Sequence, residues 1–155
     1  MPKQSAGILL YRIHEGILEV LLVHPGGPLH KNKDLGDWSI PKGEFAEDEN
    51  SFEAAKREFE EELGHTVPSE EFIELKPIKQ KSGKIVQAWA ALGDMDASIV
   101  SSNTFPLEWP PRSGKWLDVP EVDRAEWFTL PIAVQKINPA QVALLEELEE
   151  RLSDD

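Results

Sequence analysis

The chain has 155 residues, no cysteine and a formal net charge of −13. The length fits one domain over residues 1–155 with a core of its own, and the absence of cysteine excludes disulfides, thiolate metal sites and cysteine nucleophiles. The charge argues against a nucleic-acid polymer as partner, because phosphate backbones are bound by clustered Lys and Arg. No apolar run approaches the length of a membrane span or of a signal peptide. We therefore expect a cytoplasmic protein with no membrane partner.

The first third of the chain predicts strands and a loop. Residues 4–13 are apolar and β-branched, residues 14–16 form a turn, and residues 18–23 form a second apolar run. This pattern predicts an antiparallel hairpin. Residues 24–37 are rich in Gly, Pro, Lys and Asp and predict an exposed loop. A short strand is expected at residues 38–40, ended by Pro41.

A helix is predicted from residue 51 to residue 63. Asn50 can accept a hydrogen bond as the N-cap, and Glu53 three residues later completes a capping-box pattern. Gly64 stands where a left-handed residue ends a helix. The apolar residues at helical spacing, which we expect to be buried, are Phe52, Ala55, Phe59 and Leu63.

The second half predicts strands near residues 72–75, 84–92 and 125–129. Between them, residues 101–120 contain four prolines and two tryptophans, and are expected to be a loop or a strand with a long excursion. A short helix is expected at residues 131–137. Asn138 and Pro139 then begin a helix that continues to residue 152. The order of elements predicts a mixed α/β fold in which helices cover a sheet.

Three carboxylates of the first helix fall on one face. Glu58, Glu61 and Glu62 are separated by three and four residues, and like charges at this spacing destabilise an isolated helix. Magnesium prefers oxygen ligands of this kind together with substrate phosphates. Taken by itself, the cluster fits either a magnesium site or a solvated acidic face.

The residues around this cluster match a longer pattern, G-x5-E-x7-R-E-U-x-E-E-x-G-U, in which U is a bulky apolar residue. Each of the seven fixed identities matches by chance about once in fifteen, so a joint coincidence is negligible. The last U position holds His65, which we interpret as a local packing change. The matching residues are Gly43, Glu49, Arg57, Glu58, Phe59, Glu61, Glu62 and Gly64. The segment thus resembles the Nudix box, and the chain is identified as a member of the Nudix hydrolase superfamily.

The resemblance implies a Nudix fold, a mixed β-sheet sandwiched between helices. It also implies an enzyme that uses Mg²⁺, or alternatively Mn²⁺, to hydrolyse a pyrophosphate bond in a nucleoside-diphosphate-X substrate. By the same resemblance, Glu58, Glu61, Glu62 and the Lys42 carbonyl are the expected metal ligands. Arg57 would orient the carboxylates with Glu49 as its ionic partner. Gly43 would form part of the diphosphate platform, and Gly64 completes the structural motif.

Two residues are candidates for the general base. Glu58 is the first choice, while some members of the family use a carboxylate from a later loop. Glu121, which precedes the strand predicted near residues 125–129, is the candidate of that second kind. It is otherwise interpreted as a surface glutamate.

Substrate choice depends on residues outside the box. The run Trp38-Ser39-Ile40-Pro41-Lys42-Gly43 resembles the W-x-x-P-K-G form of dinucleoside polyphosphate and diphosphoinositol polyphosphate hydrolases. Lys42 either contacts a polyphosphate or only neutralises nearby carboxylates. The downstream tyrosine often found in dinucleoside polyphosphate hydrolases is absent, since Tyr11 is the only tyrosine, and Pro77 comes too early for the proline of many ADP-ribose hydrolases. The preferred substrate is a dinucleoside polyphosphate or a nucleoside triphosphate.

Aromatic and basic residues outside the box add further hypotheses. Trp109 and Trp116 are candidates for a lid or base clamp, whereas Trp38 and Trp89 are better interpreted as core residues. The loop residues His24, His30, Lys31 and Lys33 either bind a terminal phosphate or only face solvent. The alternative functions are an ADP-ribose or nucleotide-sugar hydrolase, and a non-catalytic nucleotide-binding module. The oligomeric state is not predicted.

Overall fold

The computed structural model describes residues 3–153. The predicted hairpin is confirmed: β1 (Gln4–His14) and β2 (Ile17–Pro25) pair antiparallel, with Tyr11 opposite Val20. Glu15 and Gly16 form the turn with φ values of 53° and 80°. Positive φ at both central residues is what the right-handed twist of a two-residue hairpin requires.

Seven strands form one mixed sheet. The main path runs β4-β6-β1-β2-β9, with β3 added to β1 and β5 added to β6. The β1–β6 pair is parallel and aligns Gln4 with Ile85, whereas the other pairs are antiparallel. The strands not yet bounded are β3 (Lys42–Glu44), β4 (Phe72–Glu74), β5 (Ile78–Lys79), β6 (Ile85–Leu92) and β9 (Val122–Thr129).

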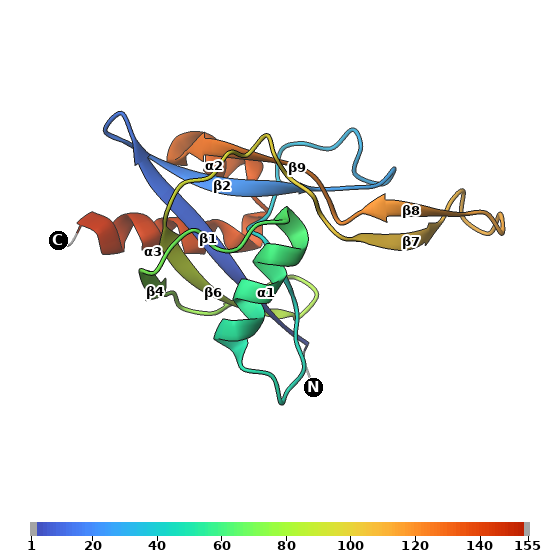
Figure 1. Ribbon diagram of the computed structural model, residues 1–155, viewed down its shortest axis with the longest axis horizontal. Helices are drawn as coiled ribbons and strands as arrows, with labels where there is room; N and C mark the ends of the chain where they lie inside the picture. The colour runs from blue at the N-terminus through green and yellow to red at the C-terminus, as the bar shows by residue number, and fades with distance from the viewer. Residues whose placement is uncertain (1–2, 154–155) are drawn as a thin grey trace.

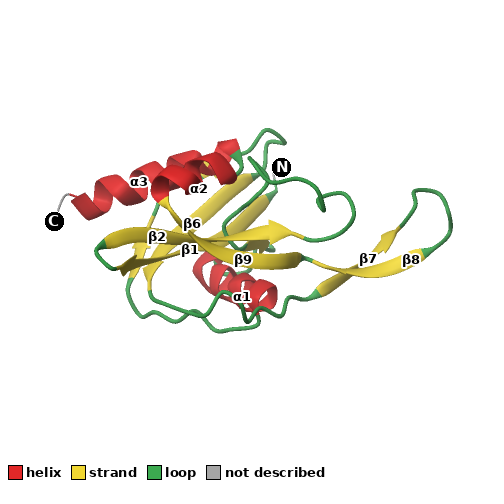
Figure 2. Ribbon diagram, turned by 90° about the horizontal axis from the view of Figure 1, so that it is seen from above, coloured by secondary structure: helices red, strands yellow, loops and turns green. Residues whose placement is uncertain are grey.

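Helices cover both faces of this sheet, which confirms the predicted fold class (Figure 2). α1 (Ser51–Leu63) packs on one face, while α2 (Leu130–Lys136) and α3 (Val142–Ser153) pack on the other. Strand β1 is buried on both faces, and its alternate residues contact the two helical layers in turn. A short 3₁₀ turn (Pro139–Gln141) precedes α3, where the sequence predicted one continuous helix.

Local signals account for α1. The Asn50 side chain accepts a hydrogen bond from the Glu53 backbone amide at 3.0 Å, and Gly64 ends the helix with a φ of 75°. Of the four residues predicted to be buried, Ala55, Phe59 and Leu63 are fully buried against the sheet, and Phe52 is half-buried. The predicted helix boundaries are therefore confirmed.

The strand predicted at residues 38–40 is wrong. These residues form only single bridges, Ser39 with Val23 and Trp38 with Ile137. The regular strand β3 instead begins at Lys42, within the Pro41-Lys42-Gly43 run that was expected to end it, and pairs with β1. Proline is compatible with this arrangement because only its carbonyl is needed, and that carbonyl accepts a hydrogen bond from the Ile8 amide at 3.1 Å.

The proline-rich segment forms a second, two-stranded sheet. β7 (Thr104–Glu108) and β8 (Trp116–Pro120) pair antiparallel and project away from the body of the molecule (Figure 1). The root of this β7–β8 arm lies at residues 103 and 121, where the Glu121 amide donates to the Asn103 carbonyl at 2.9 Å. The arm leads directly into β9, so its root is tied to the main sheet.

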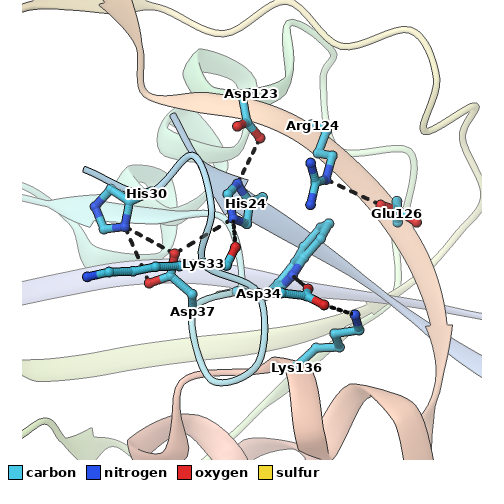
Figure 3. A network of polar contacts seen from close by, with 10 residues as sticks. His24, His30, Lys33, Asp34, Asp37, Asp123, Arg124, Glu126 and Lys136 are labelled. Carbon is cyan, nitrogen blue, oxygen red and sulfur yellow. Dashed lines mark hydrogen bonds and ion pairs between the residues drawn. The ribbon is translucent and has the colours of Figure 1, made fainter. Parts of the chain in front are cut away.

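The loop after β2 is tied down by His24, which is fully buried. Its Nδ1 lies 3.0 Å from the Asp123 carboxylate and its Nε2 lies 2.7 Å from the Lys33 carbonyl (Figure 3). The Trp38 indole packs edge-on against the His24 ring with centroids 5.1 Å apart. Both interpretations of His24, as a phosphate ligand or a solvated side chain, are therefore wrong. The core position expected for Trp38 is confirmed.

No helix within residues 3–153 is both long enough and apolar enough to span a membrane.

Candidate active site

Arg57 lies at the centre of an ion-pair network in the segment from Gly43 to Gly64. Its Nε and Nη2 donate to the two carboxylate oxygens of Glu49 at 2.9 and 3.1 Å. Its Nη1 donates to Glu58 at 2.9 Å and to Glu61 at 3.2 Å. The fork of the guanidinium thus holds three carboxylates in fixed positions. These contacts raise the pKa of Arg57, with the Glu49 hydrogen bonds as the largest favourable cause.

Glu58 is the most buried carboxylate of α1, with 8% of its surface exposed. Its carboxylate lies against the backbone of Gly43 in β3, and a Cβ atom added at Gly43 would overlap it. A side chain at position 43 is therefore disfavoured by the close approach of the Glu58 carboxylate and not by the backbone conformation. Burial and the charge of Glu61 raise the pKa of Glu58, while Arg57 opposes the shift.

Glu62 faces Lys42 on the neighbouring strand. Burial raises the pKa of Glu62 to about 8, and the charges of Glu121 and Glu58 act in the same direction. The Lys42 ammonium and a hydrogen bond from the Lys42 backbone partly offset this shift. Burial and the charge of Lys84 in turn lower the pKa of Lys42. Glu62 and Lys42 are thus both buried enough that water solvates their charged forms poorly.

Glu121 lies at the root of the arm, close enough to the helix for its charge to raise the pKa values of Glu58 and Glu62. Its own pKa is raised by burial and by the charge of Glu61. The connection is made by the chain preceding β7, where the Asn103 amide donates to the Glu61 carbonyl at 2.8 Å. Residues 58 and 121, distant in sequence, are thereby brought to one site.

The carboxylates of this site fit a divalent cation by their chemistry but not by their present positions. As the side chains of residues 3–153 lie, no three acidic or histidine groups surround one ion position, since Arg57 engages Glu49, Glu58 and Glu61. The chemistry of the groups nevertheless fits magnesium, which takes carboxylate and carbonyl oxygens. Burial is the largest cause that raises the pKa values of Glu58, Glu62 and Glu121, and the charges of neighbouring carboxylates add to it.

Two predicted site residues lie away from the carboxylate cluster, and one residue near the cluster was not predicted. Trp109 and Trp116 lie on the arm, and no ring contact joins either to the box within the described residues; their role as a base clamp stays a prediction. Sequence reasoning missed Lys84, which pairs with Glu44 at 3.1 Å and lies close to Lys42. The only signal for it is its position at the start of a predicted strand.

Two cavities adjoin these elements. One cavity, of about 650 Å³, is lined by residues 44–47 and Glu49, which run from the end of β3 into the box loop between β3 and α1, and by the polar side chains of Gln4 and Gln87. Another of about 770 Å³ lies between residues 79–82 and the start of the C-terminal helical segment at residues 138–140. Both volumes fall within the range of small-molecule sites.

The protein thus combines a mixed sheet between helices with an arginine-centred carboxylate cluster between one helix and a glycine-bearing strand. A family model of the NUDIX domain matches residues 1–148. The chain therefore belongs to the NUDIX family and is a Nudix pyrophosphohydrolase. No curated protein sequence matches it.

Solved structures share this fold at low sequence identity. An Ap4A hydrolase from C. elegans, in a binary complex, has a TM-score of 0.67 at 23% identity, and the match covers 97% of this chain and 99% of that one. The NUDIX domain of Shewanella oneidensis NrtR, complexed with ADP ribose, has a TM-score of 0.67 at 18% identity, covering 98% and 89%. A mutT/nudix family protein from Listeria innocua has a TM-score of 0.65 at 18% identity, covering 99% and 96%.

Proposed function

We propose that this protein hydrolyses a pyrophosphate bond in a nucleoside-diphosphate-X substrate in a Mg²⁺-dependent reaction, with a dinucleoside polyphosphate or a nucleoside triphosphate as the preferred substrate. The observation that carries the proposal is the network in which Arg57 holds Glu49, Glu58 and Glu61 beside Glu62 and Glu121. The likeness to an Ap4A hydrolase supports this substrate class. The structure bound to ADP ribose supports the alternative.

The ligands proposed for the metal are Glu58, Glu61, Glu62 and the Lys42 carbonyl, with Mn²⁺ as a substitute for Mg²⁺. When bound, the ion would neutralise the diphosphate and lower the pKa of an attacking water. The protein's own groups then have separate tasks. Lys42 balances charge beside Glu62, and Arg57 keeps the carboxylates oriented through its hydrogen bonds.

Glu58 is the proposed general base, because it is buried, has a raised pKa and is oriented by Arg57. It would take the proton of the water as the water oxygen bonds to phosphorus and the bridging P–O bond breaks. Glu121 is the second candidate for this role, since it lies at the same site and its pKa is also raised. The proposed roles of Lys42, Gly43, Trp109 and Trp116 are in substrate binding.

The test is product release from diadenosine polyphosphates, nucleoside triphosphates, ADP-ribose and nucleotide sugars, each with magnesium and with chelator. Glu58→Gln should lower kcat about 100- to 10,000-fold, the usual contribution of a positioned acid–base group. Glu60→Gln is the matched control, because Glu60 is exposed on the same helix. Activity that survives both chelator and Glu58→Gln would contradict the mechanism and make Glu121→Gln the next variant. Binding without turnover of any substrate would instead favour a nucleotide-binding module.

A further inference from the structure

The β7–β8 arm has no further strand to stabilise it. Its two strands form a sheet of their own that is separate from the seven-stranded sheet, and it projects from the body of the molecule (Figure 1). A two-stranded hairpin is marginally stable in water unless it gains strands or packs one face against another surface. We therefore expect another surface to pack against the arm and stabilise its two strands.

One face of the arm is apolar. Residues opposite each other in an antiparallel pair share a face, so the register defines an apolar face made of Phe105, Leu107, Leu117 and Val119. Only its root is covered: Val119 is buried beside Gly27, but Phe105 and Leu117 are 38% and 41% exposed. The opposite face carries Thr104, Glu108 and Asp118 together with Pro106, Pro120 and the exposed Trp116. Its carboxylates make it the more polar of the two faces, and the apolar face is half open to solvent through Phe105 and Leu117.

The edges of the arm are blocked against further strand pairing. Hydrogen bonds from Glu121 to Asn103 and from Trp109 to Lys115 show that odd-numbered residues bond across the hairpin. Even-numbered residues therefore direct their backbone groups outward. Among these are Pro106 and Pro120, which have no N–H to offer at an edge. A partner is thus expected on the apolar face, not along an edge.

Charge is distributed unequally along the arm. The tip carries Arg112 and Lys115, and neither forms an ion pair within residues 3–153. The tip loop is held in place by Glu108, whose carboxylate accepts hydrogen bonds from the Arg112 and Gly114 amides at 3.1 and 3.2 Å. At the root, Glu121 lies beside the charge of Glu61. Arg112 and Lys115 outnumber Glu108 at the tip, so the tip has a small positive excess, whereas the root is acidic.

We propose that the arm is a dimerisation element, which packs its apolar face against the same face of a second copy of this chain. A two-fold axis near Leu107 and Leu117 makes the two arms antiparallel, so apolar residues meet apolar residues. The basic tip of each arm then lies over the acidic root of the other. This face is self-complementary in both charge and apolarity, as an isologous interface requires, and the blocked edges limit the assembly to two chains.

The arrangement has a consequence for the site at the root. In this arrangement the tip of the second copy brings Arg112, Lys115 and Trp109 towards Glu121 at the root. The assembly is independent of the proposed function, because it rests on the arm alone. It is therefore tested by mass and not by turnover.

The first experiment is sedimentation equilibrium of the full chain over a series of concentrations. The wild-type chain should show the mass of two copies, and Leu117→Glu, which buries a charge in the interface, should show the mass of one. Ile13→Glu is the matched control, because Ile13 is 58% exposed on the distant end of β1, and it should remain dimeric. A monomeric wild-type chain, or a dimeric Leu117→Glu chain, would overturn the proposal.

Two milder variants test the geometry even if Leu117→Glu fails to fold. Lys115→Glu should raise the dimer Kd about tenfold or more, and adding Glu121→Lys to it should restore the wild-type value. Because the chain has no cysteine, Leu107→Cys places a single thiol near the proposed axis. A short bismaleimide should cross-link it into dimers, whereas Ile13→Cys should give none. Equal cross-linking at both positions, or a charge exchange without rescue, would exclude this arrangement of the arms.

Discussion

Arg57 unites the box residues because its guanidinium offers donors in several directions. Two face Glu49 on the loop before α1, and one faces Glu58 and Glu61 on the helix itself. A lysine could satisfy only part of this geometry, since an ammonium is a point charge without a planar fork. The arrangement ties the box loop to the helix, so the residues that flank Glu58 are positioned together.

Gly43 is coupled to Glu58 through space. Its φ lies outside the left-handed region, but a Cβ would overlap the Glu58 carboxylate. We expect Gly43→Ala to destabilise the protein by about 1–3 kcal/mol, the usual cost of overpacking. In a Glu58→Ala background the same change should cost less than about 0.5 kcal/mol, because the overlap is gone. Urea unfolding of the four proteins of this cycle measures the coupling, and equal costs in both backgrounds would show that the two residues act independently.

Ser5 is a position where a smaller side chain is expected to be tolerated. It is fully buried in β1, and its Oγ has no hydrogen-bond partner within residues 3–153. An unpaired buried hydroxyl is costly, so Ser5→Ala should leave the free energy of unfolding unchanged or raise it by up to about 1 kcal/mol. Ser39 is the matched control, because its hydroxyl bonds the Ile40 carbonyl at 2.7 Å and accepts from Gln141 at 3.0 Å.

Ser39→Ala should therefore lower the free energy of unfolding by about 0.5–1.5 kcal/mol. Both variants are measured in the same urea titration. If Ser5→Ala proves as destabilising as Ser39→Ala, the Ser5 hydroxyl has a partner in solution.

At the residue scale, sequence alone could predict the box because its spacing is local to one loop and one helix. It could not place Glu121, since the approach of residue 121 to residue 58 depends on how the arm leaves the sheet. Nor could it predict the burial of His24. The residues after it are rich in Gly, Pro, Lys and Asp, and only the folded loop brings Asp123 and the Lys33 carbonyl onto its two nitrogens.

The loop after β2 depends on His24 as a connecting element. Its ring bonds Asp123 on β9 and the Lys33 carbonyl within the loop, and it packs against Trp38. Removing it should leave the Lys33 carbonyl without its partner. We expect His24→Leu to destabilise the protein by about 1–3 kcal/mol and to speed tryptic cleavage after the exposed Lys31 and Lys33.

His14→Leu is the control, because His14 is exposed at the β1–β2 turn and its replacement should change stability by less than about 0.5 kcal/mol. Urea unfolding and timed proteolysis give the two measurements. A His24→Leu protein whose loop resists trypsin as well as wild type would show that other contacts hold the loop.

Elements with strong local signals, α1 and the β1–β2 hairpin among them, were predicted well, whereas β3 and the β7–β8 arm were not. α1 is specified by its cap, its apolar stripe and its terminal glycine. β3 has only three residues, and its pairing with β1 is invisible in a run that begins with proline. In the arm, Phe105, Leu107, Leu117 and Val119 alternate as strand residues do, but the four prolines of the segment left a loop and a strand with a long excursion equally open. The structure shows that two of these prolines occupy edge positions that a strand tolerates.

The whole molecule is acidic, with 29 acidic and 16 basic residues, and part of this excess is gathered at one partly buried site. Glu58, Glu62 and Glu121 all have raised pKa values there. Without a bound cation, the deprotonated forms of these groups oppose folding. The stability of the metal-free protein should therefore depend on pH through this site.

Glu62 gives the clearest form of this dependence. Its pKa is raised from 4.5 to about 8 in the folded protein, so its favourable contribution is complete below pH 4.5 and is lost as the pH rises through about 8. In chelator, Glu62→Gln should therefore melt at nearly the wild-type temperature near pH 5 and above it at pH 8.5. A difference of roughly 2–4 °C corresponds to each 1 kcal/mol in a chain of this size.

Bound magnesium should offset the loss of stability that ionised Glu62 causes at high pH. A cation that binds only the folded state raises the melting temperature, so adding it at pH 8.5 should stabilise the wild-type protein and have a much smaller effect on Glu62→Gln. Glu60→Gln removes the same formal charge from an exposed position of the same helix and should follow the wild type in every condition. Differential scanning fluorimetry across pH, with chelator and with magnesium, makes the comparison. Parallel melting curves for the wild-type, Glu60→Gln and Glu62→Gln proteins would show that Glu62 is neither strained by its burial nor a ligand. A rise that Glu60→Gln shares with Glu62→Gln would instead assign the effect to the net charge of the molecule.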